Sequence, residues 1–242
     1  MARPRNEKLK VVIRRKAWQL FVTIGYDETT YTILAKACNI KRPLVQYHFP
    51  KKETLAQQFL QAELERAQQA WNFSDNDLSH SLDALYAVGT TLYESFLSDE
   101  GRALFLRDIL TSRSLTRTVM PFNTAWITSH AQSTQSDQVR NGEEFEPTDE
   151  TLTHFGGFYE ALYKHLAEGT SYDVASGLAP VMKTIAKQLG YPMAQIYHLN
   201  PEESFGTFAL SAALHRMQED PLACWLYEGN FYKQDSELLA HV

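Results

Sequence analysis

Two prolines decide what the chain can form around residue 45. Proline is tolerated in the first turn of a helix but breaks one further along, so Pro43 and Pro50 predict a single short helix over residues 42–49. Upstream, Thr30 is a good helix N-cap and Asn39 tolerates the left-handed backbone that ends helices. These residues predict two short helices joined by a tight turn.

The apolar residues across these helices have the spacing of a helix-turn-helix. Ala35 lies inside the first helix, where two steeply crossing helices leave no room for a larger side chain. The residues that pin the second helix across the first are Leu34, Cys38, Ile40 and Val45. Ahead of them, residues 7–24 carry apolar side chains at three- and four-residue intervals, which predicts an amphipathic helix that stops at Gly25.

The second short helix has an outward face suited to a DNA major groove. A helix turns by about 100° per residue, so placing Val45 inward brings His48 near the same inner side. The residues that then point outward are Pro43, Leu44, Gln46 and Tyr47, with Arg42 at the leading end. In a major groove Leu44 would meet a thymine methyl, Gln46 an adenine edge, and Arg42 a guanine or a phosphate.

The charge of the chain is divided near the same place. Residues 1–60 contain 12 Lys and Arg against 4 acidic residues, a net charge of +8, whereas the rest contains 11 basic and 25 acidic residues, a net charge of −14. A basic unit joined to an acidic body is typical of a protein that binds a polyanion at one end. The alternative is a solvated basic surface without a partner.

Beyond residue 50 the sequence predicts helices only. Helical periodicity covers residues 51–72, 78–97, 100–112, 150–168, 173–189 and 202–218, and the polar stretch 132–149 is the candidate for a long loop. The two cysteines, Cys38 and Cys224, have no metal-ligand spacing and suit a reducing compartment. No window is long and apolar enough to span a membrane. We therefore expect an all-α, cytoplasmic protein.

Residues 25–55, GYDETTYTILAKACNIKRPLVQYHFPKKETL, resemble the N-terminal DNA-binding domain of TetR/AcrR-type transcriptional regulators. The positions that carry the resemblance are Gly25, Tyr26, Thr30, Leu34, Ala35, Ile40, Tyr47, His48, Phe49, Lys52, Glu53 and Leu55. It implies a three-helix helix-turn-helix domain over residues 1–52 and a larger helical bundle over residues 53–242 that binds an effector and dimerises. It also implies phosphate contacts from Thr30, Tyr31, Thr32, Tyr47, His48 and Lys52.

Some of these positions have a structural alternative, and others depart from the family pattern. Thr30 is also a plain N-cap, and His48 a packed histidine that orients its helix. Asn39 replaces the usual glycine of the turn, and Lys41-Arg42-Pro43-Leu44 replaces the usual Ser-Lys-Gly-Thr. Gln46 replaces an aromatic residue that commonly touches phosphate, so that contact is weakened or becomes a base contact.

The resemblance further implies a homodimer that binds double-stranded DNA and a small-molecule effector. Candidate effector-binding residues are Phe105, Trp126, Tyr159 and Tyr163, although such aromatic residues are more often core. Candidate dimer helices are residues 150–168 and 202–218, the second with Gly206, Ala209, Ala212 and Ala213 permitting close approach or packing within one subunit.

Enzyme motifs are missing from the sequence. The chain has no GxGxxG, P-loop, GxSxG, HExxH or Glu-x-x-His pattern, so we expect no catalytic residues, no metal site and no cofactor. The resemblance therefore implies a ligand-responsive transcriptional repressor that binds a palindrome-like operator. Two alternatives stay open: a DNA-bound scaffold of the same fold that recruits a protein partner, and a helical enzyme with dispersed catalytic residues.

Overall fold

The computed structural model describes residues 7–71, 82–113, 115–116, 127, 145–198, 200 and 206–219. Its helices include α1 (Glu7–Thr23), α2 (Tyr31–Ala37), α3 (Arg42–His48), α4 (Lys52–Trp71), α5 (Leu82–Leu97), α6 (Glu100–Thr111), α10 (Asp149–Glu168), α11 (Val174–Gln188), α12 (Met193–Tyr197) and α14 (Thr207–Glu219). No residue in these ranges belongs to a strand. The all-α fold class is therefore confirmed.

The helix ranges expected from the sequence agree with the structure to within a few residues. Each predicted range contains a helix, and within the described residues periodicity did not reveal the short helix α12. Residues 132–144 of the expected loop lie outside the described residues, whereas residues 145–148 lead into α10 without regular structure. Local patterning thus fixes the helices, because their apolar faces and caps repeat over short distances.

Capping residues explain where several helices begin. The N-caps are Asp99 on α6, Thr148 on α10 and Asp173 on α11, and each accepts a hydrogen bond from the backbone N–H three residues on. The bonds from Ser176 lower the pKa of the Asp173 carboxyl, because they favour its charged form. At the other end of α10, Gly169 has a φ of 65° and closes the helix in the left-handed conformation.

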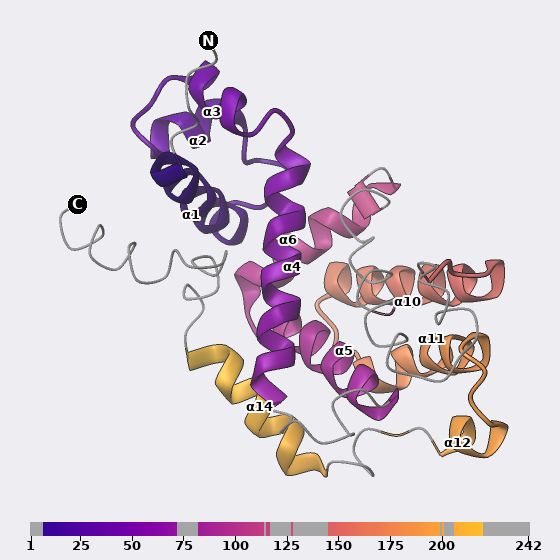
Figure 1. Cartoon of the computed structure of the whole chain (residues 1–242). Coiled ribbons are helices and arrows are strands. Elements are labelled where there is room, and N and C mark those ends of the chain that lie inside the picture. The colour runs from indigo at the N-terminus through magenta and orange to yellow at the C-terminus, as the bar shows by residue number, and fades with distance from the viewer. Residues whose placement is uncertain are drawn as a thin grey trace.

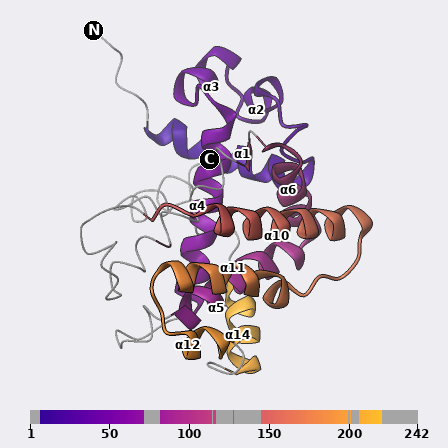
Figure 2. The same ribbon diagram turned by 90° about the vertical axis from the view of Figure 1, so that its right-hand side faces the viewer.

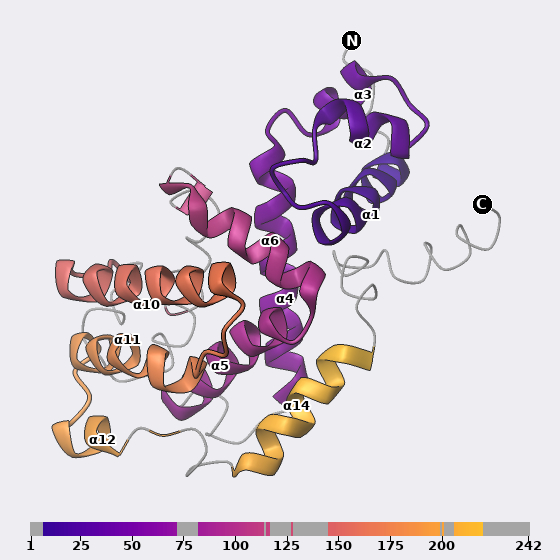
Figure 3. The same ribbon diagram turned by 180° about the vertical axis from the view of Figure 1, so that it is seen from behind.

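The helices form two connected parts. Figure 1 shows α1, α2 and α3 at one end of the molecule, and α4 running from that end into the body. In the body α10 packs on α11 and α6, whereas α14 packs on α4 and α5. Views from the side and from behind place α10 and α14 on different faces of the body (Figures 2 and 3). The domain boundary after residue 52 falls in the first turn of α4 and stays a prediction.

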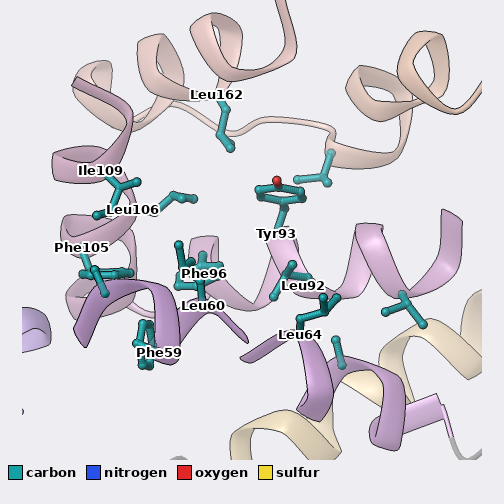
Figure 4. Close-up of a cluster of buried hydrophobic side chains, with 14 of the residues drawn as sticks. Phe59, Leu60, Leu64, Leu92, Tyr93, Phe96, Phe105, Leu106, Ile109 and Leu162 are labelled. Atoms are coloured by element: carbon teal, nitrogen blue, oxygen red, sulfur yellow. The ribbon is translucent and has the colours of Figure 1, made fainter. Parts of the chain in front are cut away.

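One aromatic cluster joins the two parts. The rings of Trp18 and Phe59 stack with centroids 3.4 Å apart, and Phe105 packs edge-on against Phe59 at 4.8 Å. Phe105 also stacks on Phe21 at 5.4 Å, so a side chain of α6 fills the core beneath α1. Figure 4 shows Phe59 and Phe105 close to Phe96 of α5. Since these rings are buried, α1, α4, α5 and α6 share one core.

Close backbone contacts also tie the first part to α6. Gly101 lies so near the Val22 carbonyl that a Cβ at position 101 would overlap it. Two turns further along α6, Asp108 accepts a hydrogen bond from the Asp27 backbone N–H at 3.3 Å. Gly25 has a φ of 92°, and a Cβ there would meet the Asp108 carboxylate at 2.5 Å. Only glycine suits this position, because it accepts both the conformation and the contact.

In the described part of the chain, none of the helices combines the length and the hydropathy needed to cross a bilayer. The same residues contain no group of three or more His, Cys, Asp or Glu side chains that could hold a metal ion.

Candidate nucleic-acid interface

Helices α2 and α3 form a helix-turn-helix whose turn is fixed by local bonds. Thr30 caps α2, and its hydroxyl accepts a hydrogen bond from the Ile33 backbone N–H at 3.2 Å. After α2, Asn39 has a φ of 52° and the Ile40 N–H donates to the Ala35 carbonyl at 3.0 Å. The prediction that Asn39 takes the left-handed conformation is confirmed. This turn sets the angle at which α3 crosses α2, because only four residues connect the two helices and the backbone N–H groups of Cys38, Asn39 and Ile40 all bond back to α2.

The outer face of α3 is exposed as its sequence predicts. Leu44 is 39 % exposed and Tyr47 is 45 % exposed, which is unusual for large apolar and aromatic side chains. Arg42 and Pro43 are also exposed, and Gln46 is half-buried. The inward residues Val45, His48 and Phe49 are all buried. The predicted orientation of the helix is therefore confirmed, whereas the base contacts of these residues stay predictions.

Tyr31 connects the start of α2 to the end of α3. Its hydroxyl donates to the Phe49 carbonyl at 2.8 Å, which leaves no second proton for a phosphate. Burial raises the pKa of Tyr31, and the nearby Glu53 carboxylate adds to the increase. A phosphate contact from Tyr31 stays a prediction, and it would require this hydrogen bond to break.

Lys52 is engaged within the chain. Its ammonium donates to the Tyr26 carbonyl at 2.8 Å and lies 4.0 Å from the centroid of the Tyr26 ring. Burial lowers the pKa of Lys52, although Asp27, Glu53 and Asp108 act in the opposite direction. The expected phosphate contact is untested, and this geometry gives Lys52 a role in holding the turn after α1. The neighbouring Lys51 is exposed at the start of α4.

The remaining predicted phosphate contacts have different settings. Thr30 and Thr32 are exposed at the start of α2, where backbone N–H groups of the first turn also face outward. His48 is buried behind α3, and its ring lies 5.3 Å from that of Tyr47 in an edge-to-face arrangement. The exposed basic side chains around this surface are Lys36, Lys41, Arg42 and Lys51. The surface is therefore positively charged, as binding to a phosphate backbone requires.

The candidate effector residues do not gather at one site. An apolar pocket of about 20 Å³ lies between α5, α10 and α11, with Tyr93 and Phe155 in its lining. Tyr159 is adjacent, and its hydroxyl is 3.4 Å from that of Tyr93. Phe105 lies instead in the aromatic core beneath α1, because α6 packs across that helix. Tyr163 is half-buried on α10, and Trp126 lies outside the described residues.

A basic three-helix unit with a capped α2, a tight turn and an exposed α3 defines a DNA-binding helix-turn-helix domain. Residues 13–59 match the sequence profile of the family described as "Bacterial regulatory proteins, tetR family". The N-terminal part of the chain is therefore a TetR-family DNA-binding domain, and the resemblance seen in the sequence is confirmed.

Curated relatives agree with this assignment over the same region. The chain is 33 % identical over 78 residues to the "Biofilm operon icaADBC HTH-type negative transcriptional regulator IcaR" of Staphylococcus aureus strains Newman and COL. The match covers 32 % of this chain and 42 % of the relative, so it spans less than half of either protein.

A solved structure described as "Crystal structure of gamma-butyrolactone receptor (ArpA like protein)" aligns with 88 % of this chain and 98 % of its own. The TM-score is 0.37 and the identity 18 %, and neither the fold nor a ligand is inferred from that likeness.

Proposed function

We propose that the protein is a cytoplasmic transcriptional repressor that binds a palindrome-like operator as a homodimer. The observation that carries this proposal is the exposed face of α3, with Leu44, Tyr47 and Arg42 directed outward from a TetR-family domain. The Staphylococcus aureus relatives, which share this domain, are described as negative transcriptional regulators, and this supports repression. Enzyme activity finds no support in the same residues, since the matched family consists of regulatory proteins.

The small size of α3 supports a homodimer. The helix has seven residues and reaches only a few base pairs, which gives one copy little specificity. Two copies about one DNA turn apart read two half-sites, and the affinity contributions of the two add.

The first test is the substitution Arg42→Ala. We expect a loss of about 10- to 100-fold in affinity for a duplex selected by the wild-type protein from a random pool, because a bidentate base contact contributes about 1–3 kcal/mol. Affinity for a scrambled duplex should fall much less. Fluorescence anisotropy with both duplexes at two salt concentrations measures the ratio.

Lys51→Ala is the matched control for Arg42→Ala. Lys51 is exposed and lies at the start of α4, so its removal should weaken both duplexes alike and reduce the salt slope by about one. Equal losses on both duplexes from Arg42→Ala would contradict base readout by that residue. Failure of the wild-type protein to bind any duplex at low salt would contradict the proposed function itself.

The two candidate dimer helices, α10 and α14, lie on different faces of the body, so each offers a separate surface for a partner subunit. Each carries an exposed apolar residue: Leu152 on α10 is 52 % exposed and Phe208 on α14 is 92 % exposed. We propose that one of these two faces is the interface, since a subunit contact there would remove an exposed apolar side chain from water.

Leu152→Asp and Phe208→Asp distinguish the two faces. We expect one of them to convert the dimer to a monomer and to raise the dimer dissociation constant at least about 100-fold, since a carboxylate buried in an apolar interface is strongly unfavourable. The other variant serves as the control and stays dimeric. Sedimentation velocity over a range of protein concentrations measures the change. Two dimeric variants would exclude both faces.

We further propose that a small-molecule effector controls DNA binding. The pocket between α5, α10 and α11 has an apolar lining and holds little more than one water molecule. A ligand therefore enters only if these helices separate, and it would favour a conformation in which they are apart. Because α6 packs on both α10 and α1, movement of α10 would reach the DNA-binding domain through α6.

A further inference from the structure

A second pocket, of about 250 Å³, lies inside the DNA-binding domain. It is a hollow, partly open to solvent, between α1, the end of α3 and the first turns of α4. Its polar lining consists of Lys10 and Arg14 from α1, His48 from α3, and Thr54 and Gln58 from α4. His48 comes from the buried side of α3, so the pocket lies behind the face that carries Leu44 and Tyr47. It is separate from the apolar pocket of the body.

Each ionisable side chain in the lining of this pocket is basic. Arg14 and His48 are buried, and Lys10 is about one-fifth exposed. The exposed Glu7 carboxylate lies 2.7 Å from the Lys10 ammonium at the N-terminus of α1. Its pKa is lowered chiefly by the hydrogen bond from Lys10, and the charges of Arg14 and His48 contribute. The electrostatic potential around this pocket is therefore positive, and cations brought together at one place favour an anionic partner.

Gln58 supplies a further polar group. Its Oε1 atom is buried and makes no hydrogen bond to any residue of the described ranges. The amide can present either its oxygen or its NH₂ group toward the pocket, because rotation by 180° exchanges the two. With the Thr54 hydroxyl nearby, the pocket holds neutral hydrogen-bonding groups beside three basic ones.

We propose that this pocket binds a small multivalent anion through phosphate or carboxylate groups held by Lys10, Arg14 and His48. Its volume is just below the range of pockets for drug-sized ligands and suits an anion of a few to about a dozen non-hydrogen atoms. The bound anion would bridge α1, α3 and α4, and so fix the DNA-reading helix on the two helices that support it. Such binding needs no DNA and no effector in the body.

Isothermal titration calorimetry of the full DNA-free chain with citrate and with inorganic phosphate tests this directly, at an ionic strength held constant with chloride. We expect saturable binding of at least one of them at one site per chain. Gln58→Glu should weaken it by at least about tenfold, because it places a carboxylate beside the ligand. Gln57→Glu makes the same change on a residue outside the pocket lining and should leave the affinity unchanged.

Glu7→Gln provides the opposite test. It removes the carboxylate that competes for Lys10, so we expect tighter anion binding by about two- to fivefold. A gain in affinity is not produced by partial unfolding, and Glu7 is exposed. Circular dichroism of all three variants confirms that each is folded.

Two outcomes would overturn the proposal. One is the absence of saturable binding by either anion, and the other is equal affinity in the wild type and Gln58→Glu. If the free anions do not bind while Gln58→Glu weakens every duplex alike, the phosphate comes from the DNA backbone and the pocket belongs to the DNA interface. The calorimetry is done without DNA, so its failure is distinct from a failure of the proposed repressor function.

Discussion

Glu63→Ala should lower the free energy of unfolding by about 3–5 kcal/mol, which is the usual effect of leaving buried cations without their anion. Glu63 is fully buried on α4. Arg66 donates through Nη1 to both of its carboxylate oxygens at 3.0 Å, and Arg102 of α6 has its Nη1 3.9 Å from the same carboxylate. Both arginines are buried, so neither gains solvation when the carboxylate is removed.

The same charges connect a third helix. Arg66 also donates through Nη2 to the backbone carbonyl of Met217 on α14. The Glu63 carboxylate therefore holds an arginine that ties α4 to α14, while the second arginine comes from α6. Removing the carboxylate affects the packing of three helices at once, which is why we expect a loss well above that of a surface ion pair.

Urea denaturation of wild type and variant at one fixed protein concentration measures this loss, since the stability of an oligomer depends on concentration. Glu65→Ala is the matched control. Glu65 lies on the same helix, is half-buried and accepts a hydrogen bond from Gln61 Nε2, one turn earlier on the same helix, at 3.0 Å, so its removal should change stability by less than about 0.5 kcal/mol. Similar small losses from both substitutions would show that the Glu63 network is open to water.

The helix-turn-helix was predictable because its determinants are local. Pro43 and Pro50 limit α3, Thr30 caps α2, and Asn39 makes the turn, all within about twenty residues of one another. The outward and inward faces of α3 follow from its 100° rotation per residue once Val45 is placed in the core. No contact with a distant part of the chain is needed for these conclusions.

The roles of other residues depend on distant partners and could not be read from the sequence. From the sequence, Lys52 is an exposed cation at the start of a helix. In the structure its ammonium donates a hydrogen bond to the Tyr26 carbonyl and lies over the Tyr26 ring. Phe105 looks like a pocket residue, but α6 crosses α1 and places its ring beside Phe21. Glu63 and Arg66 are a routine pair three residues apart in the sequence, and their burial depends on distant partners, among them α14 and Arg102 of α6.

Gly101→Ala should likewise produce a large change, because the backbone of α6 lies against the backbone of α1 at this position. A Cβ at residue 101 would overlap the carbonyl oxygen of Val22, and backbone atoms cannot move aside as a flexible side chain does. Alanine favours a helix over glycine by up to about 1 kcal/mol, yet overpacking of this kind costs about 1–3 kcal/mol, so the net effect should be a loss of stability.

Gly157→Ala gives the comparison that isolates the clash. Gly157 is also inside a helix, α10, but a Cβ there meets no atom of the chain within 4 Å. This variant should be more stable than the wild type by about 0.5–1 kcal/mol, since only the helix preference changes. The same substitution therefore has opposite expected signs at the two glycines.

Urea denaturation measures both variants, and anisotropy with the selected duplex shows whether the Gly101 variant also binds DNA less tightly. A looser α1–α6 contact lets α1 shift, and α1 supports α2 and α3, so operator affinity should fall together with stability. If Gly101→Ala were instead as stabilising as Gly157→Ala, that result would contradict the close contact between Gly101 of α6 and Val22 of α1. It would also contradict the stacking of Phe105 on Phe21, because that stacking depends on the same crossing of α1 and α6.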